Sequence, residues 1–367
     1  MATRMQAAVL YEPNTPLVIE TVDLEEPRDN EVKVRITATG ICHSDLHNIK
    51  AHREPAFPAI LGHEGTGVVE ALGAGVQHVK VGDRVILSFR PNCGRCHHCV
   101  RGVPVLCDGH KVSRKVMCDG TSRVSVRGQP VFVSTRLGTF AERIVCPAEQ
   151  AIHIQGDVPS EVAALIGCCV TTGVCAVTNA AQVKPGERVA VIGCGGVGLN
   201  IIQGARLVGA NQIIAIDVLD NKLEYAREFG ATHTIHAGSS DVVREVHNLC
   251  DGGVDFAFEA IGLSVTIEQA VECIRPGGKA VIVGMAPEAD QARINAFKLV
   301  SQQKTLMGTA YGNAQQRIDI PRMVDLYRSC RLDLDRLISR RYRLEEINDG
   351  FAALERGEVK RGVIVFQ

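Results

Sequence analysis

The sequence predicts a two-domain α/β protein in which a β-rich domain is followed by a doubly wound parallel sheet. The first observation is length, since 367 residues exceed what one hydrophobic core usually organises. The second is a series of short β-like runs, broken by glycine, up to about residue 147. The third is a change after residue 187, where β-branched runs alternate with helical ones, as in βαβ units.

The elements follow from these patterns in chain order. In the β-rich part, strands are expected at 7–12, 32–40, 65–73, 82–89 and 140–146. In the second part, strands are expected at 188–192, 213–217, 254–262 and 277–285, with helices at 199–209 and 266–274 between them. The remainder of the chain resembles neither a third domain nor a tail, so we expect it to pack back on the first domain.

Charge and composition favour a small-molecule ligand. The chain has 40 Lys and Arg against 41 Asp and Glu, a formal net charge of -1, without the blocks of like charge typical of nucleic-acid or membrane-surface partners. The N-terminal stretch lacks the h-region of a signal peptide, and no unbroken apolar stretch reaches the length of a membrane span. We therefore expect a soluble, cytoplasmic protein whose 14 cysteines are thiols or metal ligands.

The stretch GCGGVG predicts a dinucleotide site, because it follows an apolar strand-like run and opens a helical one. Gly193 permits the tight turn, Gly195 lets the backbone approach a pyrophosphate, and Gly198 allows the helix to pack closely on the strand. Gly196 lies at the helix N-terminus, whose amides can bind the anion. The alternative is a glycine-rich turn in an α/β fold that binds nothing.

Asp217 closes the next expected strand, at the distance from the glycines where an acid binds the adenosine ribose. Its carboxylate can accept hydrogen bonds from both ribose hydroxyls and would repel a 2'-phosphate. NAD is therefore favoured over NADP. Lys222 is a further candidate for a ribose contact.

Four cysteines with the spacing C-x2-C-x2-C-x7-C predict a metal site: Cys93, Cys96, Cys99 and Cys107. Tetrahedral zinc favours four such ligands on short spacers, and a site filled by four thiolates leaves no position for a substrate. This zinc is thus expected to be structural. His97 and His98 are either alternative ligands or surface residues, and an iron–sulfur cluster is the chemical alternative to zinc.

Several motifs occur together in one order: GHEGTGVVE, the four-cysteine lobe, DGTSR, GCCVTTG and GCGGVG. With them the chain resembles the zinc-dependent alcohol dehydrogenases of the medium-chain dehydrogenase/reductase superfamily over nearly its full length. The resemblance implies a GroES-like catalytic domain, residues 1–172 and 311–367, and a Rossmann NAD-binding domain, residues 173–310. It also implies an oxidoreductase with two zinc ions per subunit, one catalytic and one structural, assembled as a homodimer or homotetramer.

The resemblance further implies a catalytic zinc with three protein ligands and one open position. Its ligands would be Cys42, His63 and Cys168, and Glu64 matches an acid behind the metal that can coordinate it transiently. Asp45 matches the carboxylate that orients the ligand histidine and raises its basicity. Such a zinc is a Lewis acid that stabilises an alkoxide, from which NAD accepts a hydride.

One ambiguity concerns the neighbouring residues Cys168 and Cys169. Adjacent residues usually point in different directions, so only one of the two can bind the metal. The pattern G-C-x-x-[ST]-T-G selects Cys168. Taken singly, each of these cysteines could also be a small buried hydrophobic residue.

Other roles follow from the resemblance alone. Ser44 and His47 match a proton relay from the alcohol through the cofactor ribose to an imidazole at the surface. Five further positions match cofactor contacts. His43 stands where many relatives have an arginine on the pyrophosphate, Arg361 matches an arginine that reaches the phosphates, and the nicotinamide end is matched by Thr172, Val197 and Val283.

The substrate is expected to be a primary alcohol, aliphatic or aromatic, in a pocket lined by Phe89 and Phe140. Three alternatives stay open. The segment 111–140 is typical of fuller-length members, which include thiol-adduct formaldehyde dehydrogenases, and SFRPNC and LGTFAER resemble nicotinoproteins that retain NAD. A non-enzymatic structural protein would be marked by loss of an open-site ligand, and none is lost here.

Overall fold

The computed structural model describes residues 2–51, 56–109 and 113–366, so Lys111 lies outside the described residues. The chain forms two compact units. Unit 1 consists of Met1–Cys168, Gln315–Ser329 and Leu334–Gln367, and unit 2 consists of Cys169–Ala314 and Cys330–Asp333. The predicted boundaries after residues 172 and 310 lie within a few residues of these, but the short segment 330–333 belongs to unit 2.

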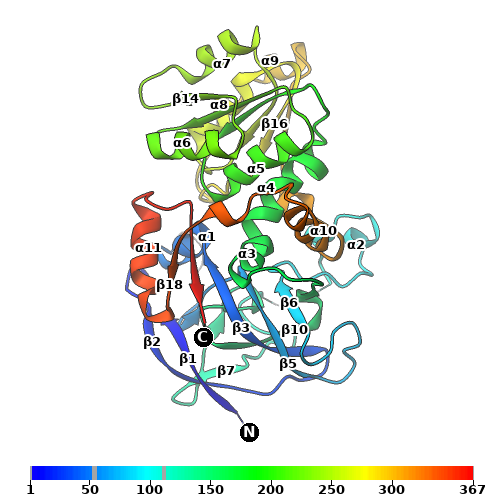
Figure 1. Ribbon diagram of the computed structural model, residues 1–367, viewed down its shortest axis with the longest axis vertical. Helices are drawn as coiled ribbons and strands as arrows, with labels where there is room; N and C mark the ends of the chain where they lie inside the picture. The colour runs from blue at the N-terminus through cyan, green and yellow to red at the C-terminus, as the bar shows by residue number, and fades with distance from the viewer. Residues whose placement is uncertain (1, 52–55, 110–112, 367) are drawn as a thin grey trace. The chain divides into compact units, whose positions relative to one another are not determined.

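Unit 1 is β-rich (Figure 1), as its glycine-broken, β-branched runs predict. One sheet has the order β8-β7-β2-β1-β4-β9 and the other the order β11-β6-β5-β3-β19-β18, with β10 also paired to β3. The strands are β1 (Thr3–Leu10), β2 (Val18–Leu24), β3 (Glu31–Ile41), β4 (Ala59–Ile60), β5 (Gly65–Leu72), β6 (Arg84–Leu87), β7 (Val124–Val126), β8 (Gln129–Pro130), β9 (Phe132–Val133), β10 (Arg143–Pro147), β11 (Ala151–His153), β18 (Ile338–Tyr342) and β19 (Arg361–Val365).

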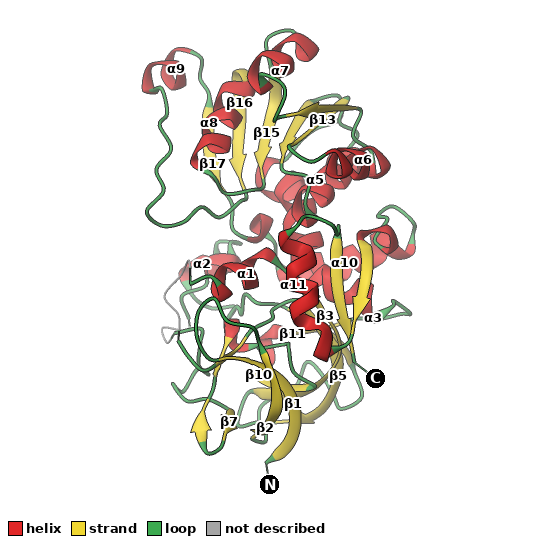
Figure 2. Cartoon of the chain, turned by 90° about the vertical axis from the view of Figure 1, so that its left-hand side faces the viewer, coloured by secondary structure: helices red, strands yellow, loops and turns green. Residues whose placement is uncertain are grey.

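The C-terminal segment completes unit 1, as expected. Its last strand, β19, pairs antiparallel with β3 and parallel with β18, and Figure 2 shows α11 beside these strands. The helices of this unit are α1 (His43–Ile49), α2 (His97–Val100), α3 (Ser160–Leu165), α10 (Gln316–Arg328) and α11 (Ile347–Glu355), with 3-10 turns η1 (Pro104–Leu106), η2 (Ser134–Arg136), η3 (Ala148–Gln150), η7 (Asp335–Leu337) and η8 (Leu344–Glu346). The hydrophobic cores of this unit consist mainly of buried Val, Ile, Leu and Ala side chains.

Unit 2 is the doubly wound domain, with six parallel strands in the order β14-β13-β12-β15-β16-β17. The order reverses between β12 and β15, and ligands of such sheets bind at the carboxyl ends of strands beside this switch point. The elements are β12 (Arg188–Ile192), β13 (Gln212–Asp217), β14 (His233–His236), β15 (Val254–Glu259), β16 (Ile274–Ile282), β17 (Thr305–Gly308), α4 (Thr171–Cys175), α5 (Gly196–Leu207), α6 (Asp220–Phe229), α7 (Val242–Cys250), α8 (Ser264–Cys273), α9 (Ala296–Ser301) and η6 (Tyr311–Asn313).

A continuous helical stretch, Ser160–Ala181, links α3 and α4 through the π-helical turn η4 (Ile166–Val170) and ends in a second such turn, η5 (Ala176–Ala181). By length and composition this stretch could cross a membrane, with a mean hydropathy of 1.8 over its most apolar 18 residues, although polar residues interrupt it. However, 83% of those 18 residues are buried inside the protein, as in the core helix of a soluble protein.

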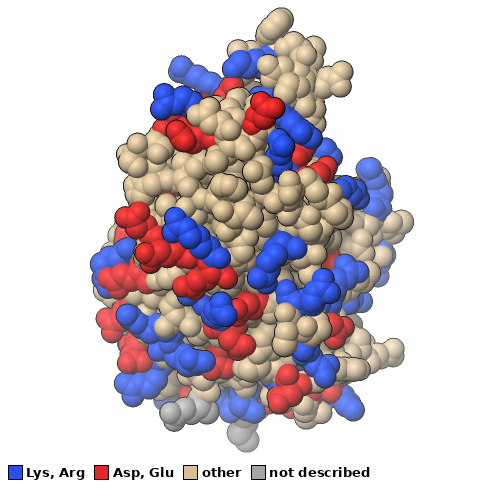
Figure 3. Space-filling model, turned by 45° about the horizontal axis from the view of Figure 1, so that its top comes forward, with Lys and Arg blue, Asp and Glu red and all other residues tan. Residues whose placement is uncertain are grey.

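The surface charges are mixed. On the face drawn in Figure 3, Lys and Arg side chains are interspersed with Asp and Glu side chains, in keeping with the net charge of -1. That face carries no large field of one sign, of the kind that steers a polyanion to its binding site.

Candidate active site and structural metal centre

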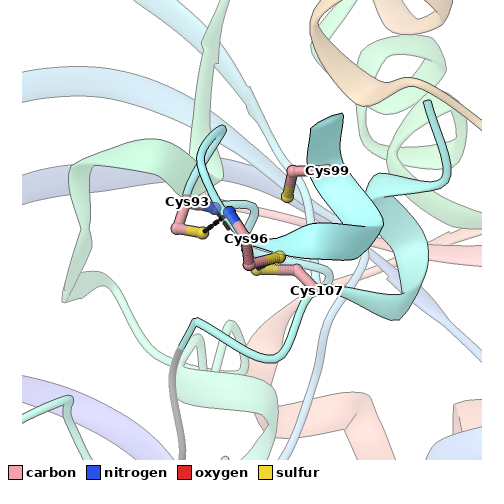
Figure 4. Close-up of side chains that lie close together, drawn as sticks. All are labelled: Cys93, Cys96, Cys99 and Cys107. Carbon is pink, nitrogen blue, oxygen red and sulfur yellow. Dashed lines mark hydrogen bonds between the residues drawn. The ribbon is translucent and has the colours of Figure 1, made fainter. Parts of the chain in front are cut away.

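The four spaced cysteines converge in unit 1 on the loop that contains α2 and η1 (Figure 4). Their sulfur atoms all lie within 4.8 Å of one another. The Sγ atoms of Cys96 and Cys107 are 3.8 Å apart. A tetrahedron with Zn–S bonds of about 2.3 Å has edges of about 3.8 Å, so this spacing fits a closed zinc site. All fourteen cysteines are described and none forms a disulfide.

Backbone amides prepare this cluster for anionic sulfur. The N–H of Cys96 donates to Cys93 Sγ at 3.3 Å, and the N–H of Cys93 donates to Cys107 Sγ at 3.3 Å. Although burial opposes it, the backbone N–H groups of Arg95 and Cys96 and the neighbouring thiols lower the pKa of Cys93 to about 7. Burial raises the pKa of Cys99 to about 12 and raises that of Cys107 as well. Crowded thiols resist joint ionisation, and a divalent cation would relieve that resistance.

The two histidines of the lobe lie on α2, with their ring centroids 5.5 Å apart. Among the described residues, the group of converging donor atoms contains the four cysteines and neither His97 nor His98. The arrangement therefore favours their interpretation as surface residues over that as alternative ligands.

A second group of donors converges elsewhere in unit 1: Cys42, His63, Glu64 and Cys168. All four residues are buried, and their ligand atoms lie within 4.8 Å of one another. They come from distant parts of the chain, since Cys42 joins β3 to α1, His63 and Glu64 precede β5, and Cys168 lies in η4. Two thiols and one imidazole suit zinc, with the acid as a further oxygen donor.

The turn before β5 holds His63 in place. Gly62 has a φ of +93°, and a Cβ there would lie 2.5 Å from Thr139 Oγ1, so only glycine fits. Asp45, on α1, is fully buried and accepts a hydrogen bond from the Gly62 N–H at 3.0 Å. The same oxygen, Oδ1, lies 3.1 Å from His63 Nδ1, which leaves Nε2 to face a metal.

The charges of these groups are coupled. Burial disfavours protonated His63, but the Asp45 carboxylate and Cys42 outweigh burial and raise the pKa of His63 well above its ordinary value. A hydrogen bond with Cys168, together with His63, lowers the pKa of Cys42 well below its ordinary value despite burial. The site thus favours a thiolate at Cys42, which is the form that binds a metal.

Arg361 forms a buried ion pair with Glu64, through Nη2 and Oε2. Glu64 is fully buried and Arg361 is 3% exposed. Burial raises the pKa of Glu64 to about 7, although Arg361 pulls in the opposite direction. Arg361 is predicted from the sequence to contact the cofactor phosphates, and no sequence pattern predicts its pair with Glu64. The two residues are 297 positions apart, so no local pattern connects them.

The relay residues Ser44 and His47 lie three positions apart on α1, on one side of the helix, and both are partly buried. His43 is exposed at the first position of the same helix. Phe89 packs edge-on against His63, with ring centroids 5.4 Å apart. Phe89 therefore stands beside the donor group, where a substrate wall would be needed.

Phe140 requires a correction. Its side chain is fully buried in the hydrophobic core, and its ring lies edge-on to Phe351 at 5.8 Å. A residue with no exposed surface cannot line an open pocket, so the structure places Phe140 in the core. An aromatic residue at a strand end has no sequence signal that separates these two positions.

In unit 2, the glycine loop has the geometry that the fingerprint implies. Gly193 has a φ of +94°, and a Cβ on Gly198 would lie 1.8 Å from the Gly193 carbonyl oxygen. Gly195 is the N-cap of α5, which begins at Gly196. Asp217 Oδ2 accepts a hydrogen bond from the loop at the Cys194 N–H, at 2.8 Å. The acid and the loop thus share one edge of the sheet.

Four further predicted cofactor residues belong to unit 2. Thr172 is buried in α4 and Lys222 in α6, while Val197 is partly buried in the first turn of α5. Val283 directly follows β16 at the carboxyl edge of the sheet. His43 and Arg361 belong to unit 1, and their predicted contacts with the cofactor stay predictions.

Comparison with known proteins agrees with this architecture. The family model "Alcohol dehydrogenase GroES-like domain" matches residues 28–160, and "Zinc-binding dehydrogenase" matches residues 196–329. An S-(hydroxymethyl)glutathione dehydrogenase of Paracoccus denitrificans is 39% identical over 375 residues, covering 99% of this chain and 100% of the relative. An NDMA-dependent alcohol dehydrogenase of Amycolatopsis methanolica is 39% identical over 367 residues, covering 99% of each chain.

Among solved structures, benzyl alcohol dehydrogenase from Acinetobacter calcoaceticus matches with a TM-score of 0.94 and 30% identity, with 100% of both chains covered. These matches span both units and confirm the predicted combination of a GroES-like and a Rossmann domain. The chain therefore belongs to the zinc-dependent alcohol dehydrogenases of the medium-chain dehydrogenase/reductase superfamily, NAD-dependent oxidoreductases that act on small-molecule alcohols.

Proposed function

We propose that this protein reversibly oxidises primary alcohols to aldehydes, with hydride transfer to NAD and with two zinc ions per chain. The observation that carries the proposal is the buried convergence of Cys42, His63 and Cys168, with Glu64 behind them. Three ligands of this kind leave one coordination position for a substrate, whereas the four-cysteine cluster leaves none.

The residues of the site have separate tasks in this proposal. Cys42, His63 and Cys168 would hold a zinc ion, which would supply Lewis acidity and so lower the pKa of an alcohol hydroxyl. Asp45 keeps the His63 ring in one orientation through its hydrogen bond to Nδ1. Ser44 would accept the hydroxyl proton while giving up its own, and His47 would release a proton to solvent, a task that suits an imidazole.

The preference for NAD rests on Asp217. Its carboxylate closes β13, and its oxygens accept hydrogen bonds from the backbone of residues 194, 218 and 219, which fixes the side chain at the sheet edge. A fixed carboxylate can bind the ribose hydroxyls and would repel a 2'-phosphate. Lys222, at the start of α6, is the second proposed ribose contact.

Aromatic primary alcohols are the favoured substrates. Phe89 stands edge-on to the metal ligand His63, so an aromatic ring next to the metal would meet an aromatic wall. The similarity to benzyl alcohol dehydrogenase over the whole chain supports the same choice. Aliphatic alcohols such as ethanol would contact the Phe89 ring over a smaller area.

Two related functions have support of their own. The similarity to S-(hydroxymethyl)glutathione dehydrogenase favours oxidation of a thiol adduct of formaldehyde. The similarity to an NDMA-dependent alcohol dehydrogenase favours a nicotinoprotein that retains NAD through turnover. We further propose that the protein is cytoplasmic, in keeping with fourteen cysteines that form no disulfide. We also propose that it assembles as a homodimer or homotetramer, as its family resemblance implies.

The test is NADH formation by the freshly purified protein on benzyl alcohol, ethanol and formaldehyde, each with and without glutathione. The proposal expects thiol-independent NADH formation, fastest on benzyl alcohol. A strict thiol requirement would replace it with the formaldehyde-adduct function. Cofactor absorbance in the purified protein without NADH release would replace it with the nicotinoprotein function.

A further inference from the structure

We infer that Glu259 is a positioning residue for the nicotinamide end of the cofactor site. The inference rests on the proposed use of NAD. Glu259 is the last residue of β15, which borders β12 at the point where the strand order reverses. It is fully buried, although it lies at the carboxyl edge where a dinucleotide binds. The dinucleotide-binding fingerprint, formed by the glycine loop and Asp217, assigns no role to an acid at this position.

The Glu259 side chain ties together the turn between β15 and α8. Its Oε1 accepts hydrogen bonds from the Ile261 N–H at 2.9 Å and the Gly262 N–H at 2.7 Å. It also accepts one from the Thr266 hydroxyl, in the first turn of α8, at 2.8 Å. Three donors on one carboxylate oxygen hold this turn in a single conformation.

The main chain of Glu259 holds a second segment. Its carbonyl oxygen accepts hydrogen bonds from the Val283 N–H at 2.8 Å and the Gly284 N–H at 2.9 Å. These residues follow β16, the next strand of the sheet. One residue therefore fixes both the turn after β15 and the chain after β16, and Val283 is already a proposed nicotinamide contact.

The two segments are in backbone contact around this carboxylate. A Cβ on Gly284 would lie 2.3 Å from the Gly262 nitrogen and 2.6 Å from Glu259 Oε2. That second oxygen is buried and has no hydrogen-bond partner within the described residues. Among the same residues, no Lys or Arg pairs with Glu259, so the N–H and O–H donors alone compensate its charge.

The side chains held in this way are apolar and open to solvent. Ile261 is 41% exposed and Met285 is 52% exposed, in a protein whose apolar side chains are mostly buried. Ile261 also packs against the glycine loop, since a Cβ on Gly193 would lie 2.5 Å from its Cγ1. Glu259 thus fixes an apolar rim beside the loop that receives the pyrophosphate, where the flat nicotinamide ring can pack.

The experiment compares Glu259→Ala and Glu259→Gln with the wild type. The amide retains an oxygen for the three donors, so the Gln variant should keep KM for NAD within about threefold of the wild type. The Ala variant should raise that KM by about tenfold or more, because the turn after β15 loses its side-chain acceptor, while the main-chain hydrogen bonds to residues 283 and 284 remain. In the Ala variant the kinetic isotope effect with deuterated alcohol should also change, since the nicotinamide ring is less well oriented for hydride transfer.

Asp255 provides a matched control, because it is an acid at the opposite end of the same strand. It accepts a hydrogen bond from the Arg188 N–H at 2.8 Å and pairs with Arg275, so it stabilises the sheet away from the carboxyl edge. Asp255→Asn should lower Tm without a change in KM for NAD. If Glu259→Ala fails to fold, Thr266→Val removes one donor and should raise KM by about two- to threefold.

Two results would overturn the inference: a wild-type KM for NAD in both Glu259→Ala and Thr266→Val, or equal KM increases in Asp255→Asn and Glu259→Ala. Either result would leave Glu259 with a general structural role. Absence of NAD binding and NAD-dependent turnover in the wild-type protein would instead overturn the proposed function. The two failures are therefore distinguishable in one set of assays.

Discussion

Replacement of Asp45 by asparagine tests the support of the proposed catalytic zinc. Asp45 is fully buried, and its Oδ1 accepts from the Gly62 N–H at 3.0 Å and lies 3.1 Å from His63 Nδ1. Asparagine has the same shape and can keep both contacts through its amide oxygen, but it removes the negative charge. The substitution therefore isolates the effect of charge on the ligand histidine.

The expected magnitude follows from these two contacts. A hydrogen bond to a charged group contributes about 1.5–3 kcal/mol, against about 1 kcal/mol for a neutral pair. The loss of charge at Asp45 should therefore cost about 1–2 kcal/mol, or roughly tenfold in zinc affinity. Asp45→Ala also leaves the Gly62 amide and the imidazole unpaired, so its loss should approach a hundredfold, the upper end for such supporting residues.

Competition with a chelator measures this affinity directly, with zinc retained per chain plotted against chelator concentration. Asp83→Asn is the matched control, because Asp83 lies 4.0 Å from His153 in the same unit and neither residue belongs to the donor groups. The control should retain both metals as the wild type does. Equal zinc retention in Asp45→Asn, Asp45→Ala and the wild type would refute the role of the carboxylate.

Three further predictions concern other parts of the chain. Cys96→Ser should remove one zinc per chain and lower Tm by several degrees, which metal analysis and thermal unfolding would show. Arg123→Met should cost about 3–5 kcal/mol at pH 7, because Arg123 forms a buried pair with Glu31 at 2.6 Å. Arg123 also holds the pKa of Asp119 below its ordinary value, so the ionised Asp119 carboxylate stabilises the folded protein above about pH 4. This contribution to the free energy of unfolding, measured with urea, should be lost as the pH falls below about 4. Asp217→Asn should raise the ratio of kcat/KM for NADP over NAD by about tenfold, because the charge that repels a 2'-phosphate is gone.

Features with a local signal could be predicted from the sequence. The loop GCGGVG and Asp217 stand in one βαβ unit, and a fixed spacing from strand to glycine to acid identifies them. The four-cysteine lobe is equally local, since all its ligands occur within one loop. In both cases the chemistry requires residue types at short, defined separations.

Features that depend on packing between distant segments could not be predicted in this way. The pair of Glu64 with Arg361 joins the turn before β5 to the C-terminal strand β19. Strands β5 and β19 are far apart in the sequence, and they lie on either side of β3 in one sheet. Phe140 is an aromatic residue of the type that often lines a substrate pocket, but its side chain is fully buried in the core. The apolar stretch 160–181 resembles a membrane span by hydropathy, and only the surrounding core explains it.

The zinc content of two cysteine variants tests the central claim most directly. Cys168 belongs to the buried donor group, whereas Cys169 is fully buried and lies 4.0 Å from the Asn200 amide nitrogen. Wild-type protein should hold about two zinc ions per chain, Cys168→Ala should lose one of them together with NAD-dependent alcohol oxidation, and Cys169→Ala should keep both metals. Retention of both zinc ions and activity in Cys168→Ala, with loss in Cys169→Ala, would contradict the proposed catalytic site.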